Sequence, residues 1–223
     1  MSDRIHAVLL LNRGYEKIDL ARGHDRVAAD AFVQAAGLAR HVHSHEYERQ
    51  QKSGRHARGK YSDLKVFAND SGAIVWGLDF AFDIVLAGKK AKHVATLGSK
   101  LLGVVYNNQV LEDAFSYYED GILKRRVSQF DGDDRADVVL EGELLAEEIE
   151  ALLRSEPDPD CDPEDLSEFV ANGKTCIVEG YVPLHGCGLD VSKRMLDAGG
   201  GELLFLNPDK ASIYTAKPWW KRW

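Results

Sequence analysis

The chain has 223 residues, of which 44% are hydrophobic and 29% are charged, and its formal net charge is −8. This length and composition are typical of a globular protein with a substantial core, arranged as one large domain or two small ones. The acidity argues against general nucleic-acid binding, because most of that affinity comes from neutralising phosphates. The amino-terminal residues lack the apolar run of a secretory signal, and the longest apolar stretch, 73–88, is too short for a bilayer, so we expect neither a signal nor a membrane span.

The first third of the chain predicts a buried strand, a helix and a basic loop. Residues 4–11 are apolar and end at Asn12-Arg13-Gly14, as a buried strand would. Asp25 is placed to cap a helix that Gly37 ends. The apolar positions that we expect on its inner face are Val27, Ala28, Ala31, Phe32 and Ala35. Residues 38–48 switch towards a period of two, and residues 50–60 are basic and lack an apolar face, which predicts a loop.

Two turn sequences predict β-hairpins in the middle of the chain. The first is Asp70-Ser71-Gly72, which separates residues 64–69 from an alternating apolar pattern that runs from Ile74 to Leu86. That pattern predicts one long strand or two strands with a bulge. The second turn is Glu119-Asp120-Gly121. The other elements expected here are a short helix over 91–99, a strand over 101–107, and the hairpin arms 114–118 and 122–130.

The pattern changes towards the carboxyl end, where helices and prolines become more frequent. We expect helices over 143–154, from Pro163 to Asn172 and near Asp190, and strands over 175–182, 202–206 and 212–215. The prolines between 157 and 163 exclude regular structure there. The whole pattern predicts an α+β fold, mostly antiparallel sheet with hairpins and interspersed short helices, in two lobes. The predicted division is a larger lobe over 1–156 and a smaller βαββ lobe over 157–223, with one continuous domain as the alternative.

One segment concentrates the negative charge of the chain. Residues 131–168, named here the acidic segment, contain sixteen Asp or Glu and only Arg135 and Arg154 as basic residues, a net of −14. The rest of the chain therefore sums to +6. The electric field of this concentrated negative charge selects basic partners and accelerates their association. We therefore predict a basic protein partner. The carboxylates expected to contact it are Glu147, Glu150, Asp158, Asp160 and Asp162. The alternative is a solvated helix face followed by an acidic linker.

Three alternating histidines suggest a second function. His41, His43 and His45 would lie on one side of a strand, where their imidazoles could hold Zn²⁺ or another divalent metal. The alternative function is therefore a metal-dependent enzyme in which Glu46 or Glu48 acts as the acid–base group. The competing interpretation is a polar strand that faces solvent beside a basic loop, and it requires no cofactor.

Other candidate motifs lack features that their chemistry needs. Residues 158–162 begin like a calcium loop, but Pro163 and Phe169 occupy the positions that need glycine and a bidentate carboxylate. His185 and Cys187 alone do not establish an activated thiol. Three cysteines without a CxxC pair favour reduced thiols and a cytoplasmic location. The tail 217–223, with three tryptophans, docks on the protein itself, makes a homo-oligomer contact or lies at a lipid headgroup layer.

Residues 97–133, LGSKLLGVVYNNQVLEDAFSYYEDGILKRRVSQFDGD, combine a helix end, a strand and a Gly-containing acidic hairpin. This order resembles segments of small cytosolic bacterial immunity and antitoxin-like proteins. The resemblance covers about a sixth of the chain and concerns the hairpin pattern. It implies a cytoplasmic protein that binds and blocks a toxin without performing chemistry. With no catalytic motif in the sequence, we expect a binding protein in preference to an enzyme.

Overall fold

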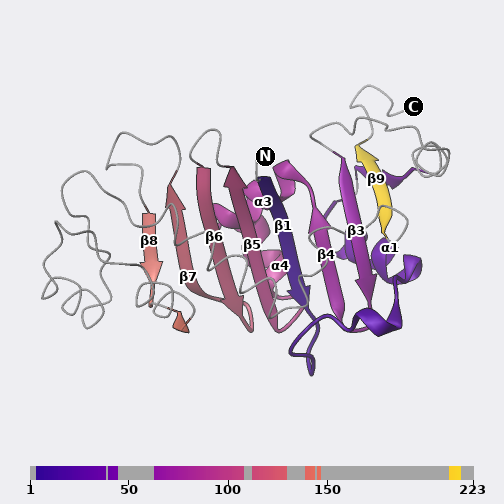
Figure 1. The fold of residues 1–223 in the computed structure, drawn as a ribbon, viewed down its shortest axis with the longest axis horizontal. Helices are drawn as coiled ribbons and strands as arrows, with labels where there is room; N and C mark the ends of the chain where they lie inside the picture. The colour runs from indigo at the N-terminus through magenta and orange to yellow at the C-terminus, as the bar shows by residue number, and fades with distance from the viewer. Residues whose placement is uncertain are drawn as a thin grey trace, which may run out of the picture.

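A single antiparallel sheet, with helices on one of its faces, forms the framework of the computed structural model (Figure 1). The structure describes residues 4–38, 40–44, 63–107, 112–129, 139–143, 145–146 and 211–216. The helical elements are η1 (Leu20–Arg22), α1 (Arg26–Ala35), α3 (Leu78–Val85) and α4 (Lys89–Ala95). The strands are β1 (Arg4–Leu11), β2 (His41–His43), β3 (Leu64–Asn69), β4 (Gly72–Trp76), β5 (Lys100–Asn107), β6 (Glu112–Glu119), β7 (Ile122–Gln129), β8 (Val139–Gly142) and β9 (Ser212–Ala216). The predicted α+β fold with a mostly antiparallel sheet is confirmed.

The strand order of the sheet is β2-β9-β3-β4-β1-β5-β6-β7-β8. Strand β1 lies near the centre, where it pairs with β4 on one side and with β5 on the other. From β5 to β8 the neighbouring strands follow one another in the chain, whereas β9 enters from the far end of the sequence and pairs with both β2 and β3. The sheet therefore connects residues near 41, 64 and 214 through backbone hydrogen bonds.

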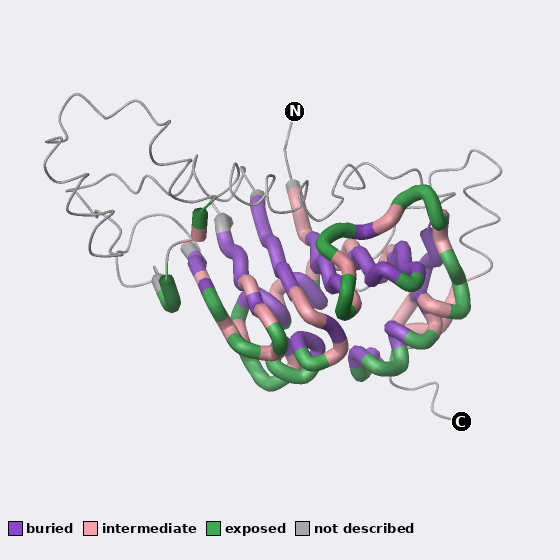
Figure 2. The backbone as a smooth tube through the Cα atoms, turned by 90° about the horizontal axis from the view of Figure 1, so that it is seen from below, coloured by how far each residue is buried: buried purple, intermediate pink, exposed green. Residues whose placement is uncertain are grey.

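Helices α1, α3 and α4 all pack on the same face of the sheet (Figure 1). The opposite face carries a second cluster of buried apolar residues, which includes Leu9, Leu11, Ile74 and Leu102. Burial is accordingly greatest along the strands and least at the turns (Figure 2). Because both faces are covered, residues 7–11 of β1 are all buried. This explains why the strand has a continuous apolar run instead of an alternating one.

Both predicted hairpins form as the turn sequences indicate. Strands β3 and β4 pair from Asn69↔Gly72 outward, and β6 and β7 pair from Glu119↔Ile122. In the second turn Asp120 has φ 47° and Gly121 has φ 79°. Two consecutive positive φ values are characteristic of a type I′ turn, whose twist matches that of the strands it joins.

A β-bulge in β7 places an arginine inside the protein. Tyr117 pairs with Arg125 while Tyr118 pairs with Leu123, so Lys124 is an extra residue on β7. The bulge reverses the alternation, and Arg125 shares a face with Tyr117 on the side away from the helices. Its side chain is only 1% exposed, and its Nη1 donates to the carbonyl oxygen of Gly142 at 3.1 Å. Arg125 thereby links β7 to the end of β8.

The prediction that the strand pattern continues from Ile74 to Leu86 is wrong beyond Trp76. Residues 78–85 form helix α3, and the residues it buries are Phe80, Ala81, Ile84 and Val85. Spacings of one, four and five residues place these side chains on one helical face. Because residues four apart share a face in a helix and also in a strand, part of the alternation fits both structures. Gly77, which has no side chain to pack, separates β4 from the helix.

Helix α1 is confirmed, but its inner face is rotated from the predicted one. The Asp25 side chain accepts a hydrogen bond from the Val27 amide at 2.8 Å, so the predicted cap is correct. The residues that α1 buries are Ala29, Phe32 and Val33, whereas Val27 is 75% exposed. The alanines at 28, 31 and 35 left the apolar stripe ambiguous, and packing against β3 decides which side faces inward.

The division into lobes at residues 156 and 157 stays a prediction. Residues 157–210 lie outside the described part of the chain. The last described element, β9, belongs to the same sheet as strands of the predicted larger lobe. The expected strand over 212–215 is confirmed by β9. The helices and strands expected over 143–206 mostly lie outside the described residues.

Substitution of Gly72 should destabilise the fold much more than substitution of Gly88. A Cβ at Gly72 would lie 2.1 Å from the carbonyl oxygen of Leu10, and the φ of 151° is unfavourable for any other residue. We expect Gly72→Ala to lower the free energy of unfolding by roughly 2–4 kcal/mol. Gly88→Ala is the control, because a Cβ there has nothing within 4 Å. Urea denaturation of both variants would show the difference, and equal midpoints would contradict the close β1–β4 approach.

Candidate functional site

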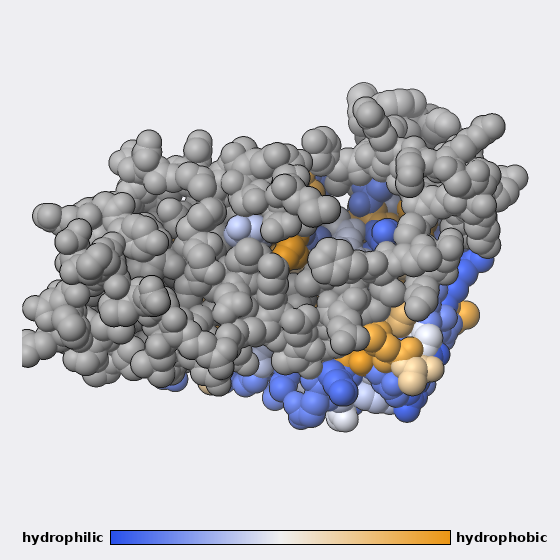
Figure 3. All heavy atoms as spheres, in the orientation of Figure 1, coloured by the Kyte–Doolittle hydropathy of each residue, from blue (hydrophilic) through white to orange (hydrophobic). Residues whose placement is uncertain are grey.

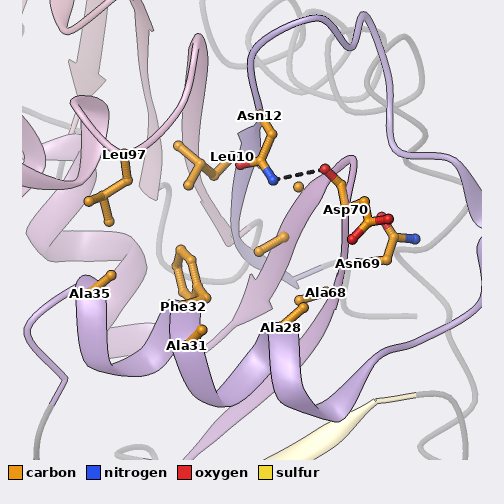
Figure 4. Close-up of a pocket in the computed structure, with 12 residues that line it drawn as sticks. Leu10, Asn12, Ala28, Ala31, Phe32, Ala35, Ala68, Asn69, Asp70 and Leu97 are labelled. Carbon is orange, nitrogen blue, oxygen red and sulfur yellow. Dashed lines mark hydrogen bonds between the residues drawn. The ribbon is translucent and has the colours of Figure 1, made fainter.

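A groove of about 300 Å³ lies between α1 and the hairpin formed by β3 and β4 (Figure 4). Ala28, Ala31 and Ala35 of α1 form one wall, because small side chains at these positions leave space along the helix. Phe32 points from α1 towards Leu10, as Figure 4 shows. The remaining lining residues are Leu10, Asn12, Phe32, Ala68, Asn69, Asp70, Gly72, Ala73 and Leu97.

One end of this groove is polar. Asn12 Nδ2 donates to the carbonyl oxygen of Asp70 at 2.9 Å, which joins the end of β1 to the hairpin turn (Figure 4). The Asp70 carboxylate accepts from Arg22 Nη1 at 3.0 Å, so its charge is already compensated. The lining offers apolar contact and hydrogen bonding instead of an acid–base pair. Its volume is at the lower end of the range for small-molecule pockets.

Asn69 fixes the polar end by using its whole amide group. Its Nδ2 donates to the carbonyl oxygens of Asp19 and Gly23 at 2.9 and 3.0 Å. Its Oδ1 accepts from the amide of Ser71 at 2.9 Å and also from the Ser71 hydroxyl. The Ser71 hydroxyl in turn accepts from the Asp19 amide at 2.8 Å. A buried amide with every donor and acceptor used holds its surroundings in one arrangement, so η1 is locked onto the hairpin.

Side chains also attach β9 to α1. The Tyr214 hydroxyl donates to Asp30 Oδ1 at 2.7 Å, and Tyr214 is only 2% exposed. Burial, and then the hydrogen bond to Asp30, raise the pKa of Tyr214 above its ordinary value. Burial likewise raises the pKa of Tyr118 to about 12, against the opposing effect of Arg126. Both phenols face the helices, and both are held in the neutral form.

The predicted histidine cluster is described only in part. His41 and His43 lie on β2, and the register places His43 opposite Tyr214 of β9. The rings of His43 and Tyr214 make an edge contact with centroids 5.7 Å apart. Because Tyr214 packs on the helical face of the sheet, the His43 side of β2 faces the helices. His45 lies outside the described residues. Among the described residues, no group of three or more His, Cys, Asp or Glu is close enough to hold a metal ion. The metal-dependent enzyme stays a hypothesis.

The predicted partner-binding carboxylates Glu147, Glu150, Asp158, Asp160 and Asp162 all lie outside the described residues. Two other members of the acidic segment, Glu141 and Glu143, are described, and both are exposed. Glu141 belongs to β8, the last strand in the sheet order. Its Oε2 is 3.9 Å from Arg126 Nη1, a long and partly solvated contact of little energetic weight.

The described residues taken together show no excess of one charge. They contain fourteen Lys or Arg and fourteen Asp or Glu, including those of β8. On the face turned to the viewer in Figure 1, the described surface is mainly hydrophilic along the lower edge, with a hydrophobic patch near η1 (Figure 3). Leu20 of η1 is 37% exposed. The described surface is therefore mixed in character.

Several further predictions fall on residues that the structure does not describe. They concern the calcium-like residues 158–162, the pair His185 and Cys187, and the tail 217–223. The groove, by contrast, was not anticipated. The alanines at 28, 31 and 35 carried the signal, because three small residues on one side of a helix leave room beside it. The sequence instead predicts these alanines as core positions on the inner face of the helix.

The comparisons with known proteins do not assign the chain to a family. No family model, no curated protein and no solved structure matches the chain at a significant level. None of the helices among the described residues is long and apolar enough to cross a lipid bilayer.

The two buried tyrosines predict a loss of stability in alkali. An unfolded tyrosine loses its proton near pH 10, whereas the folded phenols retain theirs to higher pH. Above about pH 10 the unfolded state therefore binds fewer protons, and stability falls by up to about 1.4 kcal/mol per pH unit for each tyrosine. Urea denaturation between pH 9 and pH 12 should show this slope, and Tyr118→Phe with Tyr214→Phe should flatten it. An unchanged slope in the double variant would contradict the assignment.

Proposed function

We propose that this protein binds a basic protein partner through the acidic segment, residues 131–168. The observation that carries the proposal is the division of charge along the chain. The described residues are balanced, with fourteen basic and fourteen acidic side chains. The acidic segment carries a net charge of −14, and all other residues of the chain sum to +6. A field of one sign is concentrated around a stretch with so many like charges.

The sheet order supports a separation of the two signs. Part of the acidic segment, residues 139–142, forms β8 at one edge of the sheet. At the other edge lies β2, after which the chain continues into residues 45–62. That stretch contains five Lys or Arg and two Glu. Seven strands lie between β2 and β8, so the described part of the acidic segment is far from the strand that precedes residues 45–62. At physiological salt, dissolved ions strongly screen the interaction between exposed charges that are more than about 8 Å apart. The two stretches should therefore not neutralise each other.

More specifically, we propose that this is an immunity-like protein of the cytoplasm that binds and blocks a basic toxin. Clustered carboxylates suit that role, since they imitate the phosphate charges that a nuclease binds and speed its capture. The hairpin β6–β7, which carries the resemblance to such proteins, forms as the sequence indicates. A gene for a large toxin beside the coding sequence would support this form. A toxin that binds with the same rate after loss of the acidic residues would refute it.

Reversing charge within the acidic segment should weaken association more than the same reversal elsewhere. The variant is Asp158→Lys with Asp160→Lys, and the control is Glu16→Lys with Asp79→Lys, at two exposed acids outside the segment. Both change the net charge by the same amount. With a short oligolysine peptide as the probe, we expect the association rate of the first variant to fall roughly tenfold. Biolayer interferometry at low salt measures the rates.

Raising the salt concentration provides a second measurement in the same experiment. Between about 50 and 300 mM NaCl, association of the wild-type protein should slow steeply, while the first variant should respond much less. Equal rates for both variants would mean that only total charge matters, and would contradict a localised site. Circular dichroism checks that both variants remain folded.

A further inference from the structure

His24 makes an unusual pair of contacts at the junction of β3 and β9. Its Nδ1 accepts a hydrogen bond from the backbone amide of Ala68 at 3.2 Å. Its Nε2 lies 2.9 Å from the hydroxyl oxygen of Ser212, the first residue of β9. The ring also packs against Phe67, with centroids 5.6 Å apart. One imidazole thus contacts two strands that are far apart in the sequence.

The Ala68 contact determines which form of the imidazole is present. A backbone amide can only donate, so Nδ1 must carry a lone pair and cannot carry a proton. The single ring proton is therefore on Nε2, where it can be donated to Ser212. A second proton would occupy Nδ1 and face the Ala68 N–H. The contact is consequently available to neutral histidine alone.

The position of Ala68 shows what this contact holds in place. Strand β9 pairs with β3 only over residues 64–66, so its pairing ends before Ala68. There the chain around His24 takes over, because the Asp25 amide donates to the carbonyl oxygen of Ala68 at 2.7 Å. His24 and Asp25 thus satisfy both backbone groups of Ala68. They join the beginning of α1, the end of β3 and the beginning of β9.

Most charged groups on the elements around His24 have partners of their own, and Lys65 is set apart by its burial. The Asp25 carboxylate caps α1 at the Val27 amide. On α1, Asp30 accepts from Tyr214 of β9 and lies 3.8 Å from Arg26. Lys65 of β3 lies on the same face of its strand as Phe67, opposite Ile213 of β9, and burial lowers the pKa of its ammonium. In η1, Arg22 pairs with Asp19 and Asp70.

We propose that His24 is a pH-sensitive clip that holds the start of β9 and the start of α1 against β3. At neutral pH and above the imidazole is neutral and the clip is closed. When acid adds the second proton, which histidine ordinarily accepts near pH 6.5, the Ala68 hydrogen bond is lost. The stabilisation is thus present above this range and disappears as the pH falls through it. Tyr214 and its bond to Asp30 keep β9 in place while its first residues loosen.

The chain provides a matched control in His93. Its Nε2 lies 2.8 Å from the carbonyl oxygen of Ala35, which can only accept. A doubly protonated imidazole still donates to a carbonyl oxygen, so acid preserves this contact. Acid should therefore break the His24 contact with Ala68 and leave the His93 contact intact, although both histidines touch the backbone.

Hydrogen exchange of the full chain tests the clip. Between pH 7.5 and pH 5.5, after correction for intrinsic exchange, protection of the Ala68 amide should fall about tenfold, together with that of Ser212 and Ile213 at the start of β9. His24→Asn keeps an acceptor near the Nδ1 position without titrating, so its protection should not depend on pH. His24→Phe removes the acceptor, so protection of the Ala68 amide should be low at both pH values. His93→Gln should behave like the wild type.

Two results would overturn the proposal. One is protection of Ala68 that does not change with pH in the wild type, or that changes equally in His24→Asn. The other comes from nuclear magnetic resonance of the wild-type imidazole at pH 7.5, and it does not depend on any variant folding. The ¹⁵N shifts should show an unprotonated Nδ1 in His24, and a proton on that nitrogen would exclude the clip.

Discussion

Backbone pairing along one antiparallel sheet determines where each charged stretch of this chain can act. The sheet runs from β2 to β8, with β1 near its centre and buried on both faces. The helices occupy only one face, so the chemistry at the edges depends on the strand order and not on helix packing. That order places the acidic edge strand β8 as far as the sheet allows from β2. The proposed binding function rests on a separation of the two charged stretches that follows this strand order.

The insertion of β9 is the second constraint, because it connects distant parts of the sequence. A strand near residue 214 lies between β2 and β3, and without it β2 would have no partner among the described strands. Its attachment uses polar contacts from two sides, Tyr214 to Asp30 and Ser212 to His24. Such contacts depend on protonation, whereas the apolar core around β1 does not. The β9 side of the sheet is therefore one place where the fold can respond to pH, and Tyr118 on β6 is another.

The groove beside α1 and the lock around Asn69 share the same hairpin turn. Asn69 and Ser71 hold η1 on the turn, and Asn12 joins the turn to β1. These bonds fix the polar end of the groove, while the small side chains of α1 set its width. The rigidity of this end comes from hydrogen bonds of a buried amide, and the open space comes from the absence of large side chains at 28, 31 and 35.

Local signals in the sequence predicted local structure well, and they failed where packing or distant contacts decide. The Asp25 cap, the Asp120-Gly121 turn and the apolar strand over residues 4–11 depend on neighbouring residues, and all three form. The residues of α3 fit a strand and a helix equally at spacings of four, so the tertiary context decided. Neither the pairing of β9 with β3 nor the contact of His24 with Ala68 could be inferred, because each joins residues far apart in the chain.

The central claim, that the two signs of charge lie at opposite edges of the sheet, can be measured amide by amide. Paramagnetic relaxation by a cationic and by an anionic nitroxide cosolute reports the local potential at each backbone amide. The account predicts a negative potential at residues 139–143 of the β8 edge and a positive potential at residues 41–44 of the β2 edge. Potentials of the same sign at both edges would contradict it.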